Sequence, residues 1–514
     1  MRVVFVIYDG FQVLDLTGPH EVFRSTGLYD CLVAAPRPGP VTSSGGLRVH
    51  ADSGPDLRPA GIDTLVVAGG TGVDAARRDA ALVGWVAAAA GAARRVASVC
   101  SGALLLAEAG VLDGRRVTTH WRREEQLRRE YPRLDVDCEP IFVRDGPVWT
   151  SAGVTAGMDL ALALVEDDHG REAAHAVARE LVMFLRRPGS QSQFSVPLWS
   201  AQPATDPIRA AVSSVQADPG ARHTIADLAE RSGLSARHLQ RRFTAELGVP
   251  PPRTSSGSGS RRRGGRSRRG RARRDAGAAA GLRDGGDAAQ GVPPACRGRA
   301  VRLQGPIQRD EGVRMTTYGL LVFENAEELD FVGPWEVFTA SAMLRDQGDK
   351  AVLVAEQAGP VRCNKGMRVV PDHTLDDHPH LDVLLVPGGR GARETQPDNP
   401  AVTGWIAKVA EQVDWVTSVC TGSILLHAAG PAKGRRVATH WASEDALEAR
   451  GDVTVVRDAR YVVDGNLVTS QGVSAGIDMA LWLVGRIHGR DHARAVRRYI
   501  QYEPAPPYMA DEPG

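Results

Sequence analysis

A long internal repeat constrains the fold of this chain more than any other feature. The segment SVCSG at 98–102 returns as SVCTG at 418–422, and TTHW at 118–121 returns as ATHW at 438–441. LDLTGPHEVF at 14–23 likewise returns as LDFVGPWEVF at 329–338. The period is far longer than the ~20–50 residues of solenoid repeats, so the sequence predicts two homologous globular units of roughly 190 residues each.

Each unit alternates strand and helix signals. In the first unit, 3–8, 64–68 and 95–100 are short, continuous apolar runs, which are typical of strands buried on both faces of a parallel sheet. Alanine-rich stretches at 74–93 and 102–109 lie between or after them and predict helices. The pattern predicts two flavodoxin-like α/β three-layer sandwiches.

Composition excludes several classes of protein. The chain has 514 residues, of which 43% are hydrophobic and 24% charged, as in ordinary globular proteins. No apolar run reaches the ~18 residues of a membrane-spanning helix, so no membrane partner is expected. The six cysteines form no CxxC pair, which argues against a disulfide scaffold or a zinc site and makes the cytoplasm the expected compartment.

The stretch between the units has a different composition. Residues 253–274 contain ten arginines and no acidic residue, and 251–313 carry a net charge of +10. The formal charge of +1 for the whole chain is therefore a cancellation, with −9 on the remainder. Few large apolar residues occur here, so we expect 252–314 to be a disordered Arg/Gly-rich linker that attaches to phosphates only without specificity.

A helical pair precedes this linker at 223–248. Thr224 and Asp227 fit a capping box, Gly233 offers a turn, and Ser235 can cap a second helix with an apolar stripe at Leu239, Phe243 and Leu247. The basic face of that helix suits major-groove docking, although an ordinary helical hairpin with a solvated basic face fits the spacing equally well. The candidate DNA-binding residues are Ser235, Arg237, His238, Gln240, Arg241 and Arg242.

Both units contain a strand–turn–helix with a cysteine at the turn. RVASVC-SGALLLAEAG at 95–110 and WVTSVC-TGSILLHAAG at 415–430 place Cys100 and Cys420 at the end of a β-branched run, before a small residue and a glycine. This is the pattern of a nucleophile elbow, where the helix N-terminus is expected to lower the thiol pKa. One such cysteine alone is more often a buried structural residue, but two copies in register favour a reactive group.

The front half resembles a family of transcription regulators. The string from FLRRPGSQSQFS at 184–195 to LAERSGLSARHLQRRFTAELGVPP at 228–251 is similar to AraC/XylS-type regulators with an amino-terminal ThiJ/PfpI-like domain. The resemblance implies promoter DNA and a small-molecule ligand as partners. Family members carry a second helix-turn-helix, and the Arg/Gly-rich linker occupies its place here. We hypothesise a reading-frame change near codon 252, which would leave the specificity of DNA binding in doubt.

The two cysteines with their flanks resemble the ThiJ/PfpI superfamily, whose fold is class I glutamine amidotransferase-like. The resemblance implies an acidic residue near the thiol, contributed after the first strand, and the matching residues are Asp15 and Asp330. A carboxyl group beside a thiolate should have a raised pKa and could donate a proton. A helix cap is the alternative role for both aspartates.

Further groups are expected near the cysteines. The candidate pocket residues are the glycine pairs Gly69–Gly70 and Gly388–Gly389 together with His120 and His440 of the two THW motifs. The two histidines are either polar groups that line the site or structural residues. Three other histidines, His175, His488 and His492, lie on expected helices and are expected at the surface.

The second unit resembles isonitrile hydratases of this superfamily along 316–509. The similarity lies in SVCTGS, ATHW, DGNLVTSQGVSAGIDMAL and YEPAPPY. It implies a hydro-lyase that converts an isonitrile R–NC to an N-formamide, with no cofactor or metal. Cys420 is the implied nucleophile and Asp330 the acid, and Thr421 hydrogen-bonds the acid or orients the water. The first unit has Ser101 at the matching position, and Cys100 with Asp15 is a candidate ligand-sensing site. A non-catalytic redox-sensing or chaperone-like role is the alternative.

These observations together predict four segments. They are a ThiJ/PfpI-like sensor domain at 1–198, a partial helix-turn-helix at 205–251, the linker at 252–314 and a hydratase-like domain at 315–509. The two ThiJ/PfpI-like domains are expected to form a dimer between chains or to pair within one chain.

Overall fold

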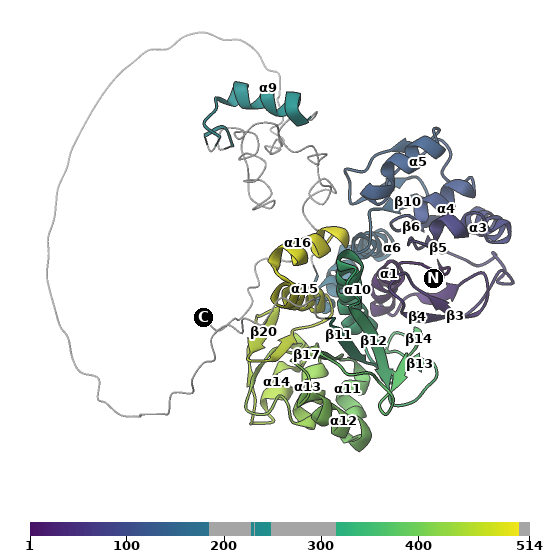
Figure 1. The fold of residues 1–514 in the computed structure, drawn as a ribbon. Coiled ribbons are helices and arrows are strands. Elements are labelled where there is room, and N and C mark those ends of the chain that lie inside the picture. Colours follow the sequence, from purple (N-terminus) through teal and green to yellow (C-terminus); the bar gives the residue numbers. More distant parts are fainter. Residues whose placement is uncertain (184–227, 231, 248–314, 503–514) are drawn as a thin grey trace, which may run out of the picture. The chain divides into compact units, whose positions relative to one another are not determined.

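The computed structural model describes residues 1–183, 228–230, 232–247 and 315–502 (Figure 1). The chain divides into two compact units, one made of Met1–Gln202 with Arg314–Gly514 and the other of Pro203–Val313. The expected capping box, the linker at 252–314 and the chain after Tyr502 lie outside the described residues.

The first repeat has a six-stranded sheet in the order β2-β1-β5-β6-β10-β9. Pairing is parallel except between β9 and β10. The strands of this repeat are β1 (Arg2–Val6), β2 (Asp30–Ala34), β3 (Gly39–Thr42), β4 (Arg48–Ala51), β5 (Thr64–Val67), β6 (Arg95–Ser98), β7 (Arg116–Val117), β8 (Asp135–Val136), β9 (Phe142–Asp145) and β10 (Val148–Ser151). The helices are α1 (Val13–Ser25), α2 (Val73–Ala76), α3 (Ala80–Ala92), α4 (Gly102–Glu108), α5 (Glu124–Glu130) and α6 (Ala156–Glu180).

The second repeat has a seven-stranded sheet in the order β15-β12-β11-β16-β17-β21-β20. Its strands are β11 (Thr317–Leu321), β12 (Lys350–Ala355), β13 (Val361–Arg362), β14 (Arg368–Val370), β15 (His373–Thr374), β16 (Val383–Val386), β17 (Trp415–Val419), β18 (Arg436–Val437), β19 (Thr454–Val455), β20 (Tyr461–Asp464) and β21 (Leu467–Ser470). Its helices are α10 (Glu328–Arg345), α11 (Arg390–Glu394), α12 (Pro400–Ala410), α13 (Gly422–Ala429), α14 (Glu444–Glu448), α15 (Ala475–His488) and α16 (Arg490–Tyr499).

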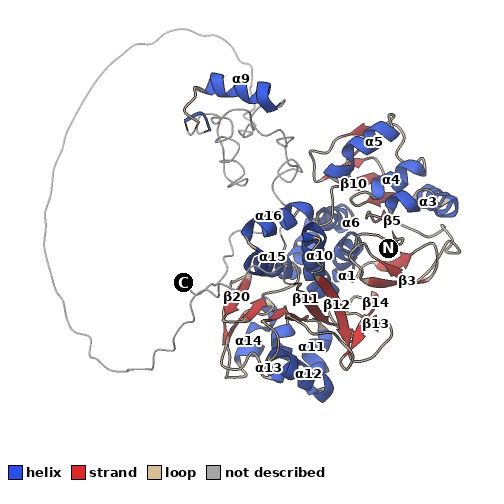
Figure 2. Cartoon of the chain, viewed as in Figure 1, coloured by secondary structure: helices blue, strands red, loops and turns tan. Residues whose placement is uncertain are grey.

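The chain reverses direction at the middle of each sheet. From β1 it crosses to β2 on one side and then returns to β5 and β6 on the other. Right-handed crossovers then place α1 on one face of the sheet and α3 with α4 on the opposite face, which gives three layers (Figure 2). The α/β prediction is confirmed, and the strands are buried on both faces as their apolar runs indicate. The helix expected over 74–93 is divided in two, because Asp79 caps the start of α3.

The two repeats pair within one chain. Strand β14 of the second repeat runs antiparallel to β4 of the first, with Val369 opposite Val49, and this pair joins two hairpins into the four-stranded sheet β13-β14-β4-β3. Helix α1 packs against α10 (Figure 1). Intrachain pairing, one of the two arrangements left open by the sequence, is present in this structure.

The described part of the second unit contains one complete helix, α9 (Ala236–Leu247). Gly233 has a φ of 63°, which glycine adopts without strain, and forms the turn before it. Ser235 caps the helix, since its hydroxyl accepts a hydrogen bond of 3.3 Å from the His238 amide. In the described residues of both units, no helix is long and apolar enough to cross a membrane.

Candidate functional site

The two cysteines stand on strained elbows at the carboxyl ends of β6 and β17. Cys100 and Cys420 both have a φ of 56°, in the left-handed region that non-glycine residues seldom adopt. The following glycine permits the sharp turn, because a Cβ on Gly422 would lie only 2.1 Å from the Val386 carbonyl oxygen. The expected strand–turn–helix is present in both repeats.

An aspartate faces each elbow: Asp15 from the first turn of α1 in the first repeat, and Asp330 from the first turn of α10 in the second. The Asp15 carboxylate accepts a 2.8 Å hydrogen bond from the Gly69 amide, and the Asp330 carboxylate accepts one of 2.9 Å from the Gly388 amide. Both aspartates are fully buried, and the second carboxyl oxygen of each has no hydrogen-bond partner among the described residues. Neither aspartate is an N-cap, because α1 and α10 begin one residue after Gln12 and Glu327.

Burial sets the protonation of these groups. Burial raises the pKa of Asp330 well above its ordinary value, the Glu327 carboxylate raises it further, and the Gly388 amide and the Cys420 thiol offset only part of this. Burial and the neighbouring aspartate also raise the thiol pKa values of Cys100 and Cys420. The expectation that the helix N-terminus gives a net lowering of the thiol pKa is therefore wrong, because the loss of water outweighs it.

The small residue after each cysteine fixes the glycine pair behind the elbow. The Thr421 hydroxyl accepts a 3.1 Å hydrogen bond from the Gly389 amide and donates one of 3.3 Å to the Gly389 carbonyl. Ser101 forms the same two bonds with Gly70, at 2.9 and 3.2 Å. Thr421 thus positions the backbone next to Gly388, the partner of Asp330. The expected hydrogen bond from Thr421 to the acid is absent among the described residues, and its expected role in orienting the water stays a prediction.

The two THW histidines lie beside the elbows and reach across to the other repeat. The His440 ring donates through Nε2 to the Glu180 carbonyl oxygen at 3.1 Å, and its ring carbon lies 2.8 Å from the Cβ position of Gly472. That Cβ position is 3.7 Å from the Cys420 Sγ. Burial and then Arg122 lower the pKa of His120 to about 4, although the Tyr499 carbonyl raises it in part. Both histidines are therefore structural links that also line the sites.

His488 was expected at the surface, and that expectation is wrong. Its side chain is 4% exposed, and its Nε2 lies 2.9 Å from the Tyr318 hydroxyl. The apolar pattern of α15 indicated a helix correctly but did not show that the far end of this helix packs against β11.

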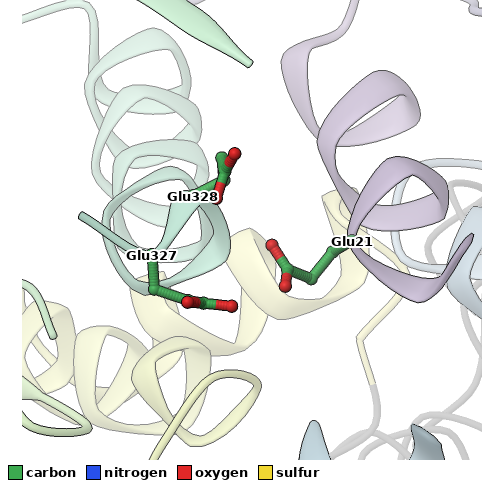
Figure 3. A group of neighbouring side chains, drawn as sticks. All are labelled: Glu21, Glu327 and Glu328. Atoms are coloured by element: carbon green, nitrogen blue, oxygen red, sulfur yellow. The ribbon is translucent and has the colours of Figure 1, made fainter. Parts of the chain in front are cut away.

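A carboxyl cluster between the repeats was not anticipated from the sequence. Glu21 of α1 points toward Glu327 and Glu328 at the start of α10 (Figure 3). The Lys365 ammonium lies 3.3 Å from Glu327 and 3.7 Å from Glu21, and it supplies the positive charge that a metal ion would otherwise bring. The Glu328 carboxylate accepts the Lys365 amide at 2.9 Å. Only the assembled fold brings these residues together.

The pKa values of the three carboxyl groups in this cluster are shifted in different directions. Burial raises the pKa of Glu21, and so does the adjacent Glu327. Burial and Glu327 raise the pKa of Glu328 to about 8. For Glu327 itself, burial acts in the opposite direction to Lys365 and its hydrogen bonds, and the net effect is a lowered pKa. Glu327 therefore pairs with the Lys365 ammonium, whereas the pKa values of the other two carboxyl groups are raised, and the cluster is an ion pair at the interface.

In the first repeat, Gln12 occupies the position that corresponds to Glu327 of the second repeat. Its side-chain amide donates to the Glu336 carboxylate, and its oxygen accepts from the Ser44 hydroxyl at 2.6 Å. Burial raises the pKa of Glu336 to about 7, and the Gln12 hydrogen bond lowers it only in part. The two cysteine sites therefore have different electrostatic surroundings despite their common fold.

The candidate DNA-binding residues lie on or just before α9. Arg237 and Arg241 are exposed, and His238 and Arg242 are partly exposed. Leu239 is buried, as the predicted apolar stripe requires. Gln240 belongs to the helix, but its side chain lies outside the described part, as do those of Phe243 and Leu247.

Comparison with known protein families finds the same family in both repeats. The DJ-1/PfpI family matches residues 1–167 and again 319–486. The chain belongs to the DJ-1/PfpI family. One similar protein is an isonitrile hydratase from Pseudomonas putida, 41% identical over 195 residues, which are 38% of this chain and 82% of the hydratase.

Other relatives are regulators. The HTH-type transcriptional regulator CdhR from Pseudomonas aeruginosa is 31% identical over 252 residues, which are 48% of this chain and 74% of CdhR. Among solved structures, a ThiJ/PfpI family protein from Pseudomonas syringae is 31% identical, with a TM-score of 0.35, over 38% of this chain and 78% of that one. This DJ-1/PfpI chain therefore has relatives of both kinds, enzymes and AraC-type regulators.

Proposed function

We propose that the second repeat is a cysteine-dependent isonitrile hydratase, which converts R–NC and water to R–NH–CHO. The observation that carries the proposal is the pair of Cys420 on its elbow and a fully buried Asp330, whose pKa is raised by burial. The relative of this name, 41% identical over 195 residues, supports it. The motifs SVCTGS, ATHW and YEPAPPY place the likeness in this repeat.

The first step forms a bond between the Cys420 sulfur and the terminal carbon of the isonitrile. The thiol has a raised pKa, so it reacts in concert with proton movement, and one proton reaches the former isonitrile carbon. Asp330 supplies that proton and then recovers the one that leaves the thiol. The product is a thioimidate, R–N=CH–S–Cys420, and no charge is left on the protein.

The second step adds water to the thioimidate carbon. The water oxygen bonds to the carbon, the nitrogen gains one proton, and the carbon–sulfur bond breaks while the remaining water proton goes to sulfur and restores the Cys420 thiol. Asp330, which recovered a proton in the first step, gives it to the nitrogen and takes one from the attacking water; its second carboxyl oxygen has no hydrogen-bond partner among the described residues. Thr421 holds the Gly389 peptide in place and so keeps the Gly388 amide on Asp330.

We further propose that the front half acts as a regulator-type module, with the domain boundaries at 1–198, 205–251, 252–314 and 315–509. Cys100 and Asp15 would form its ligand-sensing site, and the exposed Arg237 and Arg241 of α9 would contact DNA. The relative CdhR supports this assignment. A gel shift with upstream DNA at two salt concentrations tests it: specific binding persists against competitor DNA, whereas attraction to phosphates disappears as salt rises.

A redox-sensing role is less well supported. Oxidation of a cysteine follows thiolate character and exposure, but Cys100 and Cys420 are 8% and 6% exposed and burial raises both thiol pKa values. Hydratase chemistry tolerates such a thiol because the neighbouring acid moves the proton during attack.

Formamide production from a simple isonitrile tests the hydratase proposal. The full chain should form the N-formamide, Cys420→Ser should lose this activity, and Cys100→Ser should keep it. Equal loss in the two variants would assign the chemistry to both repeats or to neither. No formamide from the wild-type chain would refute the proposal.

A further inference from the structure

Each repeat closes the site of the other with the end of its last helix. In the second site, the Ser474 hydroxyl donates to the Val182 carbonyl at 2.7 Å, and the Ser474 amide donates to the Leu181 carbonyl at 3.3 Å. In the first site, the Thr155 hydroxyl donates to the Gln501 carbonyl at 2.7 Å in the same way. The two connections are related by the repeat, so Val182 and Gln501 occupy equivalent positions.

The backbone at these two positions is the same. Val182 and Gln501 both have a φ of 53°, and each follows the last turn of its helix. Their side chains differ in one chemical property: a carboxamide offers a hydrogen-bond acceptor, whereas an isopropyl group offers none. Any difference between the two sites at this point therefore comes from the side chain.

Gln501 uses its acceptor on the loop beside Cys100. Its side-chain oxygen accepts a hydrogen bond from the Gly153 amide, and Gln501 is 1% exposed. The same oxygen lies 2.8 Å from the Cβ position of Gly153. In the first site, a buried carboxamide from the opposite repeat thus occupies the Gly153 amide.

The second site has Val182 at this position, and its side chain offers no hydrogen-bond acceptor. Gly472 is the counterpart of Gly153. It is a buried residue, and its amide donates no hydrogen bond to any described residue. A buried amide without an acceptor is rare and costly in folded proteins, which makes it a natural place for a ligand atom. Its position fits that role, since a Cβ on Gly472 would lie 3.7 Å from the Cys420 sulfur.

The loops that contain Gly153 and Gly472 also differ in the carbonyl group that accepts the hydrogen bond from the cysteine amide. The Cys100 amide donates to the Ala152 carbonyl at 3.0 Å, whereas the Cys420 amide donates to the Ser470 carbonyl at 3.1 Å. Ser470 corresponds to Ser151, so the peptide before Gly153 is turned toward the elbow in the first site only. The carboxamide of Gln501 and this turned peptide hold the same glycine from its two sides.

We propose that the Gly472 amide is the hydrogen-bond donor for a ligand at Cys420, and that Gln501 occupies the equivalent donor in the first site. The ligand class is a small molecule with an electrophilic carbon and an adjacent hydrogen-bond acceptor. In the hydratase reaction, on which this part of the proposal rests, the acceptor is the oxygen that water adds to the thioimidate carbon. A fixed amide at that oxygen stabilises the charge that develops there.

This arrangement assigns different roles to the two repeats. In the second site the Gly472 amide is available to a ligand, and in the first site the Gly153 amide becomes available only when Gln501 moves. A sensing site and a catalytic site can then share one fold in one chain, because a single side chain at a repeat-related position separates them.

Alkylation by iodoacetamide tests the proposal without any isonitrile. The cysteine sulfur bonds to the methylene carbon, iodide leaves with a proton, and the amide oxygen of the reagent is the acceptor for the glycine N–H. The rates at Cys100 and Cys420 in the full chain are measured by mass spectrometry of their peptides. In the wild-type chain, Cys420 should react faster than Cys100.

Two exchanged substitutions provide matched controls. Gln501→Val should raise the rate at Cys100 about tenfold, the effect of one backbone hydrogen bond, and leave the rate at Cys420 unchanged. Val182→Gln should slow Cys420 by a similar factor and leave Cys100 unchanged. Gln501→Leu serves in place of the valine variant if the latter does not fold, and circular dichroism checks each chain.

The proposal is overturned if Gln501→Val or Gln501→Leu leaves the Cys100 rate unchanged, if either changes both cysteines equally, or if Val182→Gln does not slow Cys420. Its failure is separate from failure of the hydratase assignment. A chain that forms no formamide but shows both exchanged effects would retain the donor assignment and lose only the substrate.

Discussion

Replacement of Glu336 by glutamine should remove part of the pH dependence of stability. Glu336 is 4% exposed, lies between the repeats and accepts a hydrogen bond from Gln12. Burial raises its pKa from 4.5 to about 7, so the folded chain binds a proton that the unfolded chain has already lost between these values. Stability due to this group is therefore fully present below pH 4.5 and falls as pH rises toward 7.

The size of the effect follows from the shift. Each pKa unit corresponds to about 1.4 kcal/mol, so a rise from 4.5 to about 7 gives a total loss of about 3 kcal/mol. Proton linkage then predicts that the free energy of unfolding falls by about 2 kcal/mol between pH 5 and pH 7.5 because of this group. Glutamine keeps an oxygen that can accept from Gln12 and does not titrate.

Urea unfolding at pH 5 and pH 7.5 measures the difference. The wild-type chain should lose about 2 kcal/mol more between the two pH values than Glu336→Gln does. Glu125→Gln is the control, because Glu125 is an exposed residue and its charge should not affect the pH dependence. An equal loss in the wild type and in Glu336→Gln would refute the reasoning on burial.

Three other substitutions probe the site and the interface. Asp330→Asn should reduce formamide production at least ~100-fold, the usual contribution of a general acid, with an unchanged circular dichroism spectrum; retained activity would exclude Asp330 as the proton donor. Lys365→Met should leave Glu327 without its ammonium and lower the free energy of unfolding by about 3 kcal/mol, as for a broken buried pair, and no change in the urea midpoint would contradict that pairing. Gly422→Ala should destabilise the second repeat, because its Cβ would lie 2.1 Å from the Val386 oxygen, and an unchanged thermal midpoint would show that the elbow tolerates a side chain.

Local sequence was sufficient to predict the elbows, and the family resemblance indicated the acids beside them. A β-branched run, a cysteine, a small residue and a glycine already determine the turn at Cys100 and Cys420, and the structure has both at a φ of 56°. The resemblance indicated Asp15 and Asp330 as the acids that follow the first strand, and they lie in the first turns of α1 and α10, where each accepts a hydrogen bond from a glycine amide. These features depend on residues within one repeat.

Features that depend on both repeats could not be predicted in this way. The thiol pKa values are raised because the assembled chain excludes water from the elbows, which no local pattern reveals. The contact of Gln501 with Gly153 joins residues from opposite repeats, and so does that of Gln12 with Glu336. A comparison of repeat-related positions would have indicated one of them, since Gln501 stands where the first repeat has Val182.

The covalent intermediate tests the central claim most directly. The full chain is mixed with an isonitrile, quenched within the first turnover and digested, and the masses of the peptides with Cys100 and Cys420 are measured. The account predicts a gain equal to one isonitrile on the Cys420 peptide and none on the Cys100 peptide. Formamide production with the adduct on Cys100, or with no adduct on either cysteine, would contradict it.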